Sequence, residues 1–138
     1  MKTEAARRLA ITLATVALWC AGPAPAHHST AAEFDAGKPV TFTGVVKKVA
    51  WTNPHIYTHV EVAQQGGAPV VYHVEGGSPN TLFRQGWRKE SLAVGEVVTV
   101  TGQAAKNPDS PNIGQATIVT KDGRRIYTGN GPEKSPQD

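Results

Sequence analysis

The stretch HIYTHVEVAQQGGAPVVYHVE, residues 55–75, decides the fold of this chain. Both of its ends are rich in β-branched and aromatic residues and alternate between apolar and polar positions, which is the period-two pattern of a half-buried strand. The segment QGGA, residues 65–68, has the composition of a hairpin loop. We therefore predict an antiparallel hairpin with strands over 55–63 and 70–75, apolar on one face and polar on the other.

Two registers of this hairpin would gather histidine and glutamate on the polar face. In the first, His59 lies opposite His73, and the same register puts Tyr57 opposite Glu75. The second, shifted by two residues, pairs Glu61 with His73 instead. Opposed positions have Cβ atoms about 5 Å apart, within reach of one metal ion. We treat His59, His73 and Glu75 as a candidate metal cluster, against the alternative that they form the solvated face of an antiparallel hairpin.

Four further strands and one short helix are predicted around the hairpin. The strands cover residues 40–51, 96–103, 113–120 and 125–128. The first of them breaks its alternation at Gly44, as a bulge or bend would. The helix opens at Ser78, a good N-cap, and stops at Gly86, which leaves Trp87 to pack beneath it. A bent first strand and one helix between the third and fourth strands predict a small OB-like antiparallel β-barrel, with a β-sandwich as the alternative.

Residues 1–26 have the layout of a cleavable secretory signal peptide. Three basic residues stand among the first eight, an apolar run covers 9–20, and an A-x-A cleavage motif ends at Ala26. The apolar run is too short for a stable membrane anchor, which needs about 20 residues. Trp19 directly before Cys20 disfavours lipidation of that cysteine. We therefore expect a periplasmic protein that has no membrane attachment after cleavage.

Cleavage at this position would change what the mature chain can offer chemically. Removal of 26 residues from 138 leaves 112, with 11 basic and 10 acidic residues, and takes away the only Cys and the only Met. Near-neutral charge and export together argue against nucleic acid as a partner. We expect a monomer with one domain over 27–128 and a disordered tail over 129–138.

The same cleavage would make His27 the N-terminal residue, followed at once by His28. An N-terminal histidine offers its amine and its ring nitrogen to one ion, and a further imidazole can complete a tetragonal nitrogen set that suits Cu(II). His55 follows Asn53-Pro54 at a strand start, where a side chain can point toward a neighbouring segment. We predict a copper site formed by His27, His28 and His55. The alternative is that the first two histidines only begin an exposed leader.

The sequence contains no pattern typical of an enzyme. It has no nucleophile elbow, no glycine-rich loop for phosphate or dinucleotide, and no convincing pair of catalytic acids. A non-enzymatic binding protein is therefore expected. The basic residues Arg84, Arg88 and Lys89 could receive an anion, or could simply complement the helix dipole.

A metal-independent function is the alternative to copper binding. An OB-like module could bind a peptide, a glycan or an envelope protein through its barrel face or through the basic end of the helix. The barrel face that we consider lies around Trp51, Tyr57 and Tyr72.

Several short motifs together resemble one known family. They are HHS (27–29) with EFD (33–35), PVT (39–41), WTNPH (51–55), and GSPN (77–80) followed by Arg84, Gly86 and Trp87. Over about residues 27–128 they resemble a family of small exported proteins from Gram-negative bacteria that is catalogued as a domain of unknown function. The resemblance implies secretion and a compact β-rich domain, but no activity and no catalytic residues. It also marks the HHS start and the WTNPH turn as recurring features, which adds weight to His27, His28 and His55.

Overall fold

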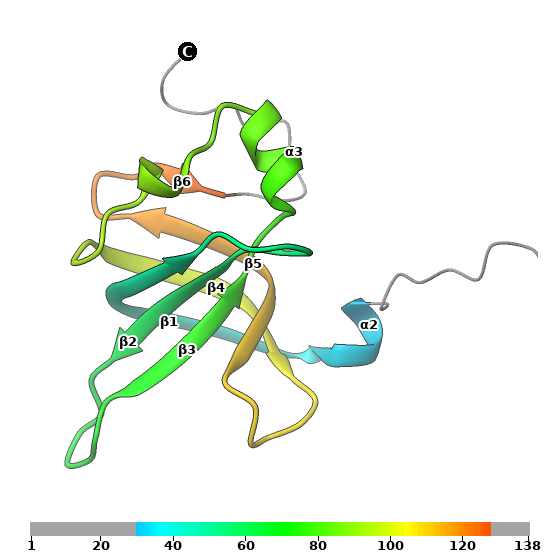
Figure 1. Cartoon of the computed structure of the whole chain (residues 1–138). Helices are drawn as coiled ribbons and strands as arrows, with labels where there is room; N and C mark the ends of the chain where they lie inside the picture. Colours follow the sequence, from blue (N-terminus) through cyan, green and yellow to red (C-terminus); the bar gives the residue numbers. More distant parts are fainter. Residues whose placement is uncertain (1–29, 128–138) are drawn as a thin grey trace, which may run out of the picture.

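Five strands pair edge to edge into a closed ring in the computed structural model, which describes residues 30–127 (Figure 1). They are β1 (Phe34–Ala50), β2 (Tyr57–Val62), β3 (Val70–Glu75), β4 (Val97–Ala105) and β5 (Asn112–Thr120). Strand β1 pairs with both β2 and β4, β4 pairs with β5, and β5 returns in parallel to β3. The predicted OB-like β-barrel is thus confirmed. The predicted signal peptide and tail lie outside the described residues.

Strand β1 closes the barrel because it bends and serves two neighbours. Its residue Val45 pairs with Glu61 of β2 and with Val97 of β4. Two residues further along β1, Lys47 is an extra residue in the pairing with β2. The bulge therefore lies three residues after Gly44, the position at which the sequence pattern predicts it. Gly44 has a different role, because a Cβ there would lie 2.5 Å from the carbonyl oxygen of Glu61. The glycine therefore allows the two backbones to cross closely.

The N-terminal part of β1 is longer than the sequence pattern indicates. A short helix, α2 (Thr30–Glu33), precedes it, and the strand begins at Phe34 rather than at residue 40. Phe34 is buried and pairs with Ala105, but the register with β4 then shifts before Pro39. This irregularity interrupts the apolar–polar alternation, so the sequence pattern indicates the strand only from residue 40.

The last strand is shorter than predicted. Strand β6 (Arg125–Ile126) pairs with β5, and Tyr127 then leaves the strand with a φ of 52°. Its hydroxyl donates hydrogen bonds to the carbonyl oxygens of Arg88 (2.8 Å) and Lys89 (2.9 Å). Burial raises the pKa of this phenol well above its usual range. Tyr127 thus ends the strand because its side chain belongs to the core.

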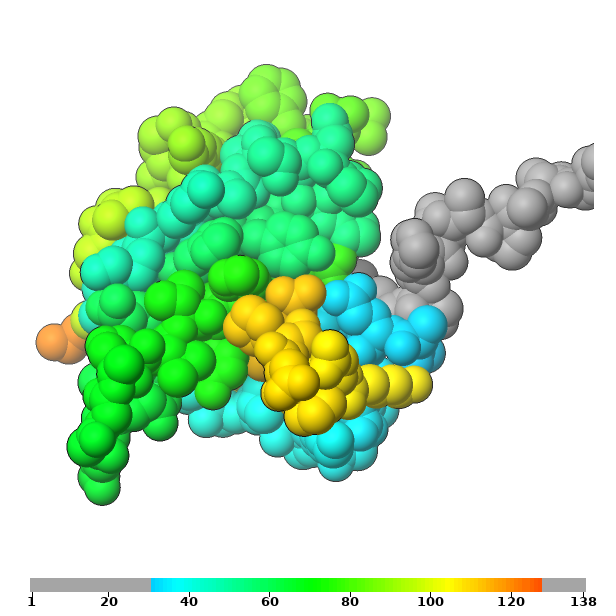
Figure 2. All heavy atoms as spheres, turned by 60° about the horizontal axis from the view of Figure 1, so that its bottom comes forward, coloured from blue at the N-terminus to red at the C-terminus, as the bar shows by residue number. Residues whose placement is uncertain are grey.

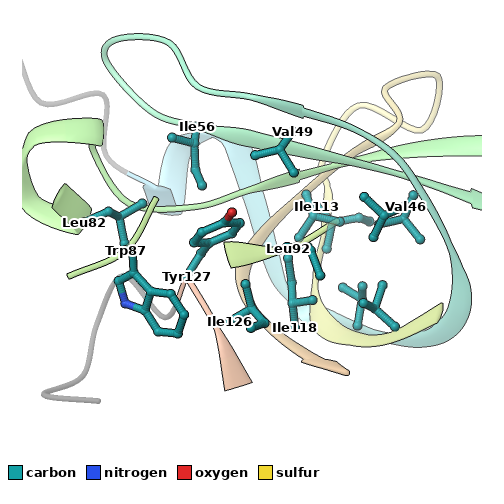
Figure 3. Close-up of a cluster of buried hydrophobic side chains, with 14 residues drawn as sticks. Val46, Val49, Ile56, Leu82, Trp87, Leu92, Ile113, Ile118, Ile126 and Tyr127 are labelled. Carbon is teal, nitrogen blue, oxygen red and sulfur yellow. The ribbon is translucent and has the colours of Figure 1, made fainter. Parts of the chain in front are cut away.

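One apolar core fills the barrel and extends beneath helix α3 (Pro79–Arg84), which is followed by the short 3-10 helix η1 (Lys89–Ser91) (Figure 3). As predicted, Ser78 caps α3, accepting a hydrogen bond from the Thr81 amide (3.3 Å). Trp87 is fully buried and meets Tyr127 edge to face, with ring centroids 5.6 Å apart. None of the helices within residues 30–127 is long and apolar enough to cross a membrane.

Candidate functional site

The outer face of the β2–β3 hairpin carries the candidate site. The structure confirms the first of the two predicted registers, with His59 opposite His73 and Tyr57 opposite Glu75. In this register the buried Val60 of β2 lies opposite Tyr72 of β3, and the buried Val74 of β3 lies opposite the buried Thr58 of β2. We call His55, Tyr57, His59, His73 and Glu75 the histidine face.

His55 is held beside Glu75 by the backbone of the loop that precedes β2. The amide of Ile56 donates to the Gly77 carbonyl oxygen (3.1 Å), and the Gly76 amide donates to the Ile56 carbonyl oxygen (2.9 Å). A Cβ on Gly76 would lie 2.7 Å from the Ile56 side chain, so this close approach requires glycine. The loop is thereby locked against the end of β3, and His55 Nδ1 contacts Glu75 Oε1.

The contact between His55 and Glu75 leaves one ring nitrogen available. Glu75 keeps only 12% of its side chain exposed, whereas His55 keeps 44%. Among residues 30–127, the contact of His55 Nδ1 with Glu75 is the ion pair or hydrogen bond that this ring makes, and Nε2 takes part in neither. A carboxylate on one nitrogen fixes the tautomer and orientation of an imidazole that binds metal through the other.

The second pair on the histidine face is formed by His59 and His73. Their ring centroids lie 4.3 Å apart, with the ring planes tilted by 46°. Lys48 of β1 pairs with His59 on the other side. Burial lowers the pKa of His59, and the neighbouring His73 and Lys48 lower it further.

Helix α2 is held beside the start of β5, the strand that pairs with His73 of the hairpin. Lys106 Nζ donates to the Ala31 carbonyl oxygen (2.6 Å), and Asn112 Nδ2 donates to Glu33 Oε1 (3.1 Å). Asn112 is itself the β5 partner of His73. Figures 1 and 2 show α2 and the start of β1 beside the start of β5 and the adjoining hairpin.

Electrostatics link this helix to the histidine face. Burial raises the pKa of Tyr57, and the charges of Glu75 and then Glu33 raise it further. Glu33 is therefore close enough to act on the hairpin, although it lies far away in the sequence. Helix α2 thus ends beside Asn112, the β5 residue that pairs with His73.

The predicted metal residues are only partly brought together. Glu75 contacts His55 rather than completing a cluster with His59 and His73, because the hairpin end is closed by the loop that carries His55. His27 and His28 lie outside the described residues. Between residues 30 and 127, no group of three or more His, Cys, Asp or Glu side chains is arranged to hold a metal ion.

The aromatic residues considered for partner binding do not form one surface. Tyr57 lies on the outer face, whereas Tyr72 lies on the other side of the hairpin and stacks on Phe42, with centroids 4.6 Å apart. Trp51 instead meets Tyr127 edge to face at 5.6 Å. The alternation of β2 and β3 separates these rings.

The basic cluster is also divided by its contacts. The Arg88 guanidinium lies 3.9 Å from the ring centroid of Phe83 and donates to the Phe83 carbonyl oxygen (3.1 Å). Arg84 and Lys89 are exposed. Arg88 therefore stabilises the end of α3, and the other two remain at the surface.

A shallow depression of about 440 Å³ lies at the turn between β5 and β6. It is lined by Glu96, Val97, Lys121, Asp122 and Arg124. Arg124 joins both carboxylates, with Nε 2.8 Å from Asp122 Oδ2 and Nη2 3.2 Å from Glu96 Oε2. These charges neutralise one another, so we place the candidate site at the histidine face.

Sequence reasoning missed two contributors to the site, Glu33 and Asn112. Neither belongs to a motif with a chemical signature, and they meet only because the β3–β5 pairing closes the barrel. The contact between His55 and Glu75 was also missed, although both residues were candidates. No local pattern reports the direction of a loop side chain.

Comparison with known proteins gives a family but no function. No curated protein and no solved structure matches the chain. The family of unknown function DUF6152 matches over residues 15–114, which span the predicted cleavage site, the hairpin, α3 and the start of β5. The chain therefore belongs to this family, as its motifs indicated.

Proposed function

We propose that this protein is exported to the periplasm and binds copper there. His55 supplies one imidazole, and the N-terminal amine and ring of His27 together with His28 supply the remaining nitrogens. The function is binding, for buffering or delivery of the ion, rather than turnover. The proposal depends on cleavage after Ala26, because only then is the amine of His27 free.

The observation that carries the proposal is the contact between His55 and Glu75. Metal-binding histidines commonly place a carboxylate on the second ring nitrogen, which orients the ring and makes it a better ligand. A half-exposed imidazole oriented in this way, in a loop that is hydrogen-bonded to the end of β3, suits a site whose other ligands arrive from another segment.

The position of α2 supports the arrival of the N-terminus at this place. His28 precedes Thr30 by two residues, so their Cα atoms lie within about 7 Å of each other at full extension. Helix α2 is tied to Lys106 and Asn112 beside the histidine face. The short separation along the chain between these histidines and α2 favours their approach to the histidine face.

Cu(II) titration of the processed protein tests this proposal. Intact mass must first show that the exported chain begins at His27. We expect one tight Cu(II) site, measured against a competing chelator, with several nitrogen ligands in its electron paramagnetic resonance spectrum. One additional alanine ahead of His27, or His55→Ala, should each lower the affinity strongly.

His73→Ala is the matched control, because it removes an imidazole from the same face without touching His55. It should leave the tight site intact. Unchanged affinity in the extended protein or in His55→Ala would show that the proposal is wrong.

A metal-independent binding module is the second candidate function. Phe83 on α3 is 56% exposed, and Arg88 lies against its ring. This exposed pair fits a peptide, glycan or envelope protein that offers an apolar group beside an acidic one. In the presence of a chelator, a peptidoglycan fragment or acidic peptide should then shift the α3 amide resonances, and Phe83→Ala should abolish the shift. The absence of any shift would exclude these two ligands.

A further inference from the structure

We infer that His59 and His73 form a second, independent site for a divalent transition-metal cation of the class that prefers imidazole, such as Zn(II) or Cu(II). This site uses two side chains that the copper site does not need. It lies one row along the hairpin from the Tyr57–Glu75 pair, which corresponds to about 7 Å of strand.

The two side chains are close enough to act together as a bidentate ligand. His59 and His73 are directly opposed in the β2–β3 register, and their ring centroids lie 4.3 Å apart. Opposed Cβ atoms at about 5 Å allow two imidazoles to reach one ion. Waters can complete its coordination on this open face.

The backbone beneath the pair is rigid. Thr58 and Val60 flank His59 along β2, and Val74 follows His73 in β3; all three are at most 1% exposed. Their burial fixes the two strands, so the imidazoles need only rotate about their own side-chain bonds. A site carried by packed strands is better preorganised than one carried by loops.

The ring nitrogens of this pair are available. Within the described part of the chain, the rings of His59 and His73 contact each other, and no hydrogen bond occupies a ring nitrogen. This distinguishes them from His55, whose Nδ1 is already bound by Glu75.

The surrounding charges allow a cation at this position. Lys48 faces His59 from β1, but it is exposed and its amine can move away. Asn112 faces His73 from β5 and is neutral. Along the same outer face, Glu61 and Glu75 each stand two residues from one of the two histidines; Glu61 pairs with Lys47, and Glu75 contacts His55.

The test uses protein in which the first site has been disabled. A chain with one extra alanine ahead of His27 and with His55→Ala cannot form the proposed copper site, so the outcome does not depend on that proposal. Titration of this protein with Zn(II) should move the ring resonances of His59 and His73 together at one ion per chain. It should also raise the Tm, because the ion binds only the folded hairpin.

Two single variants and one control decide the outcome. His59→Gln and His73→Gln should each lower Zn(II) affinity by more than the 10–100-fold that loss of an outer-shell partner typically costs. Lys48→Gln should retain or strengthen binding. Unaltered Tm values of the metal-free variants would show that their folds are intact.

Three results would overturn the inference. They are the absence of a Zn(II) response, movement of only one ring, and unchanged affinity in either single variant.

Discussion

The carboxylate of Glu75 determines which nitrogen of His55 remains for a metal ion. We predict that Glu75→Ala lowers Cu(II) affinity of the processed protein by about 10–100-fold, because the imidazole loses its orienting partner. Competition titration measures the change. Glu61→Ala is the matched control, since Glu61 lies on the same outer face but pairs with Lys47 at 3.3 Å. Equal losses in both variants would contradict the assigned role of Glu75.

Thr58 carries a buried hydroxyl that has no hydrogen-bond partner among the described residues. An unsatisfied buried polar group costs about 1–3 kcal/mol. We therefore predict that Thr58→Val raises the free energy of unfolding by about 1 kcal/mol or more. Urea denaturation of the metal-free protein measures this difference.

Thr120 provides the opposite case for comparison. Its hydroxyl is also buried but bonds with Asp122 Oδ1 and with the Arg124 carbonyl oxygen (3.1 Å). Thr120→Val should lower the free energy of unfolding by about 1–3 kcal/mol, because it leaves Asp122 Oδ1 and the Arg124 carbonyl oxygen without this hydrogen-bond partner. A loss of stability in Thr58→Val would show that its hydroxyl has a partner in solution.

At the scale of elements, the crossing of β1 and β2 depends on Gly44. A Cβ at this position would meet backbone oxygen and the side chain of Val60, at 2.5 and 2.7 Å. We predict that Gly44→Ala lowers the free energy of unfolding by about 1–3 kcal/mol, the usual cost of overpacking. Gly67→Ala in the hairpin loop should have little effect, because its nearest atom would lie 3.7 Å away. Comparable denaturation midpoints for the two variants would contradict this account.

The turn between β5 and β6 should make stability depend on pH. Hydrogen bonds from Thr120 and Arg124 lower the pKa of Asp122 in the folded protein. Its stabilising contribution is therefore complete above the unfolded pKa of about 3.9 and is lost as pH falls through the folded pKa. We predict that the Tm of the metal-free protein falls below about pH 4, and less steeply in Asp122→Asn.

Asp109→Asn is the control for this pH dependence, because Asp109 is an exposed residue of the β4–β5 loop. It should leave the slope of Tm against pH unchanged. Parallel slopes for the wild type and Asp122→Asn would remove Asp122 as the cause.

At the scale of the whole molecule, the barrel is closed by its shortest pairing. Strands β3 and β5 share two register pairs, His73 with Asn112 and Val74 with Ile113, whereas β1 and β4 share eight. We predict that the His73 amide, which donates to Pro111 at 3.0 Å, exchanges with solvent faster than amides of the β1–β4 pairing. Native-state hydrogen exchange by NMR measures the rates. Equal protection would mean that the barrel opens only as a unit.

Much of this architecture follows from local sequence patterns. The alternation in 55–63 and 70–75, the loop at 65–68 and the capping serine at 78 lead to elements close to those observed. The pattern failed at the start of β1, where a register shift against β4 interrupts alternation. Tyr127 likewise left its expected strand because burial of its ring beside Trp87 outweighs two more residues of pairing.

The sequence by itself determined most of the strands and the polar face of the hairpin, because side-chain alternation is a local property of a strand. It narrowed the hairpin to two registers but did not decide between them. The tertiary structure alone selected the register, joined His55 to Glu75 and brought Glu33 to the start of β5. Those contacts depend on how the barrel closes and on which way a loop side chain points. Neither is encoded by a repeating pattern, since each arises from packing between segments that are distant in the chain.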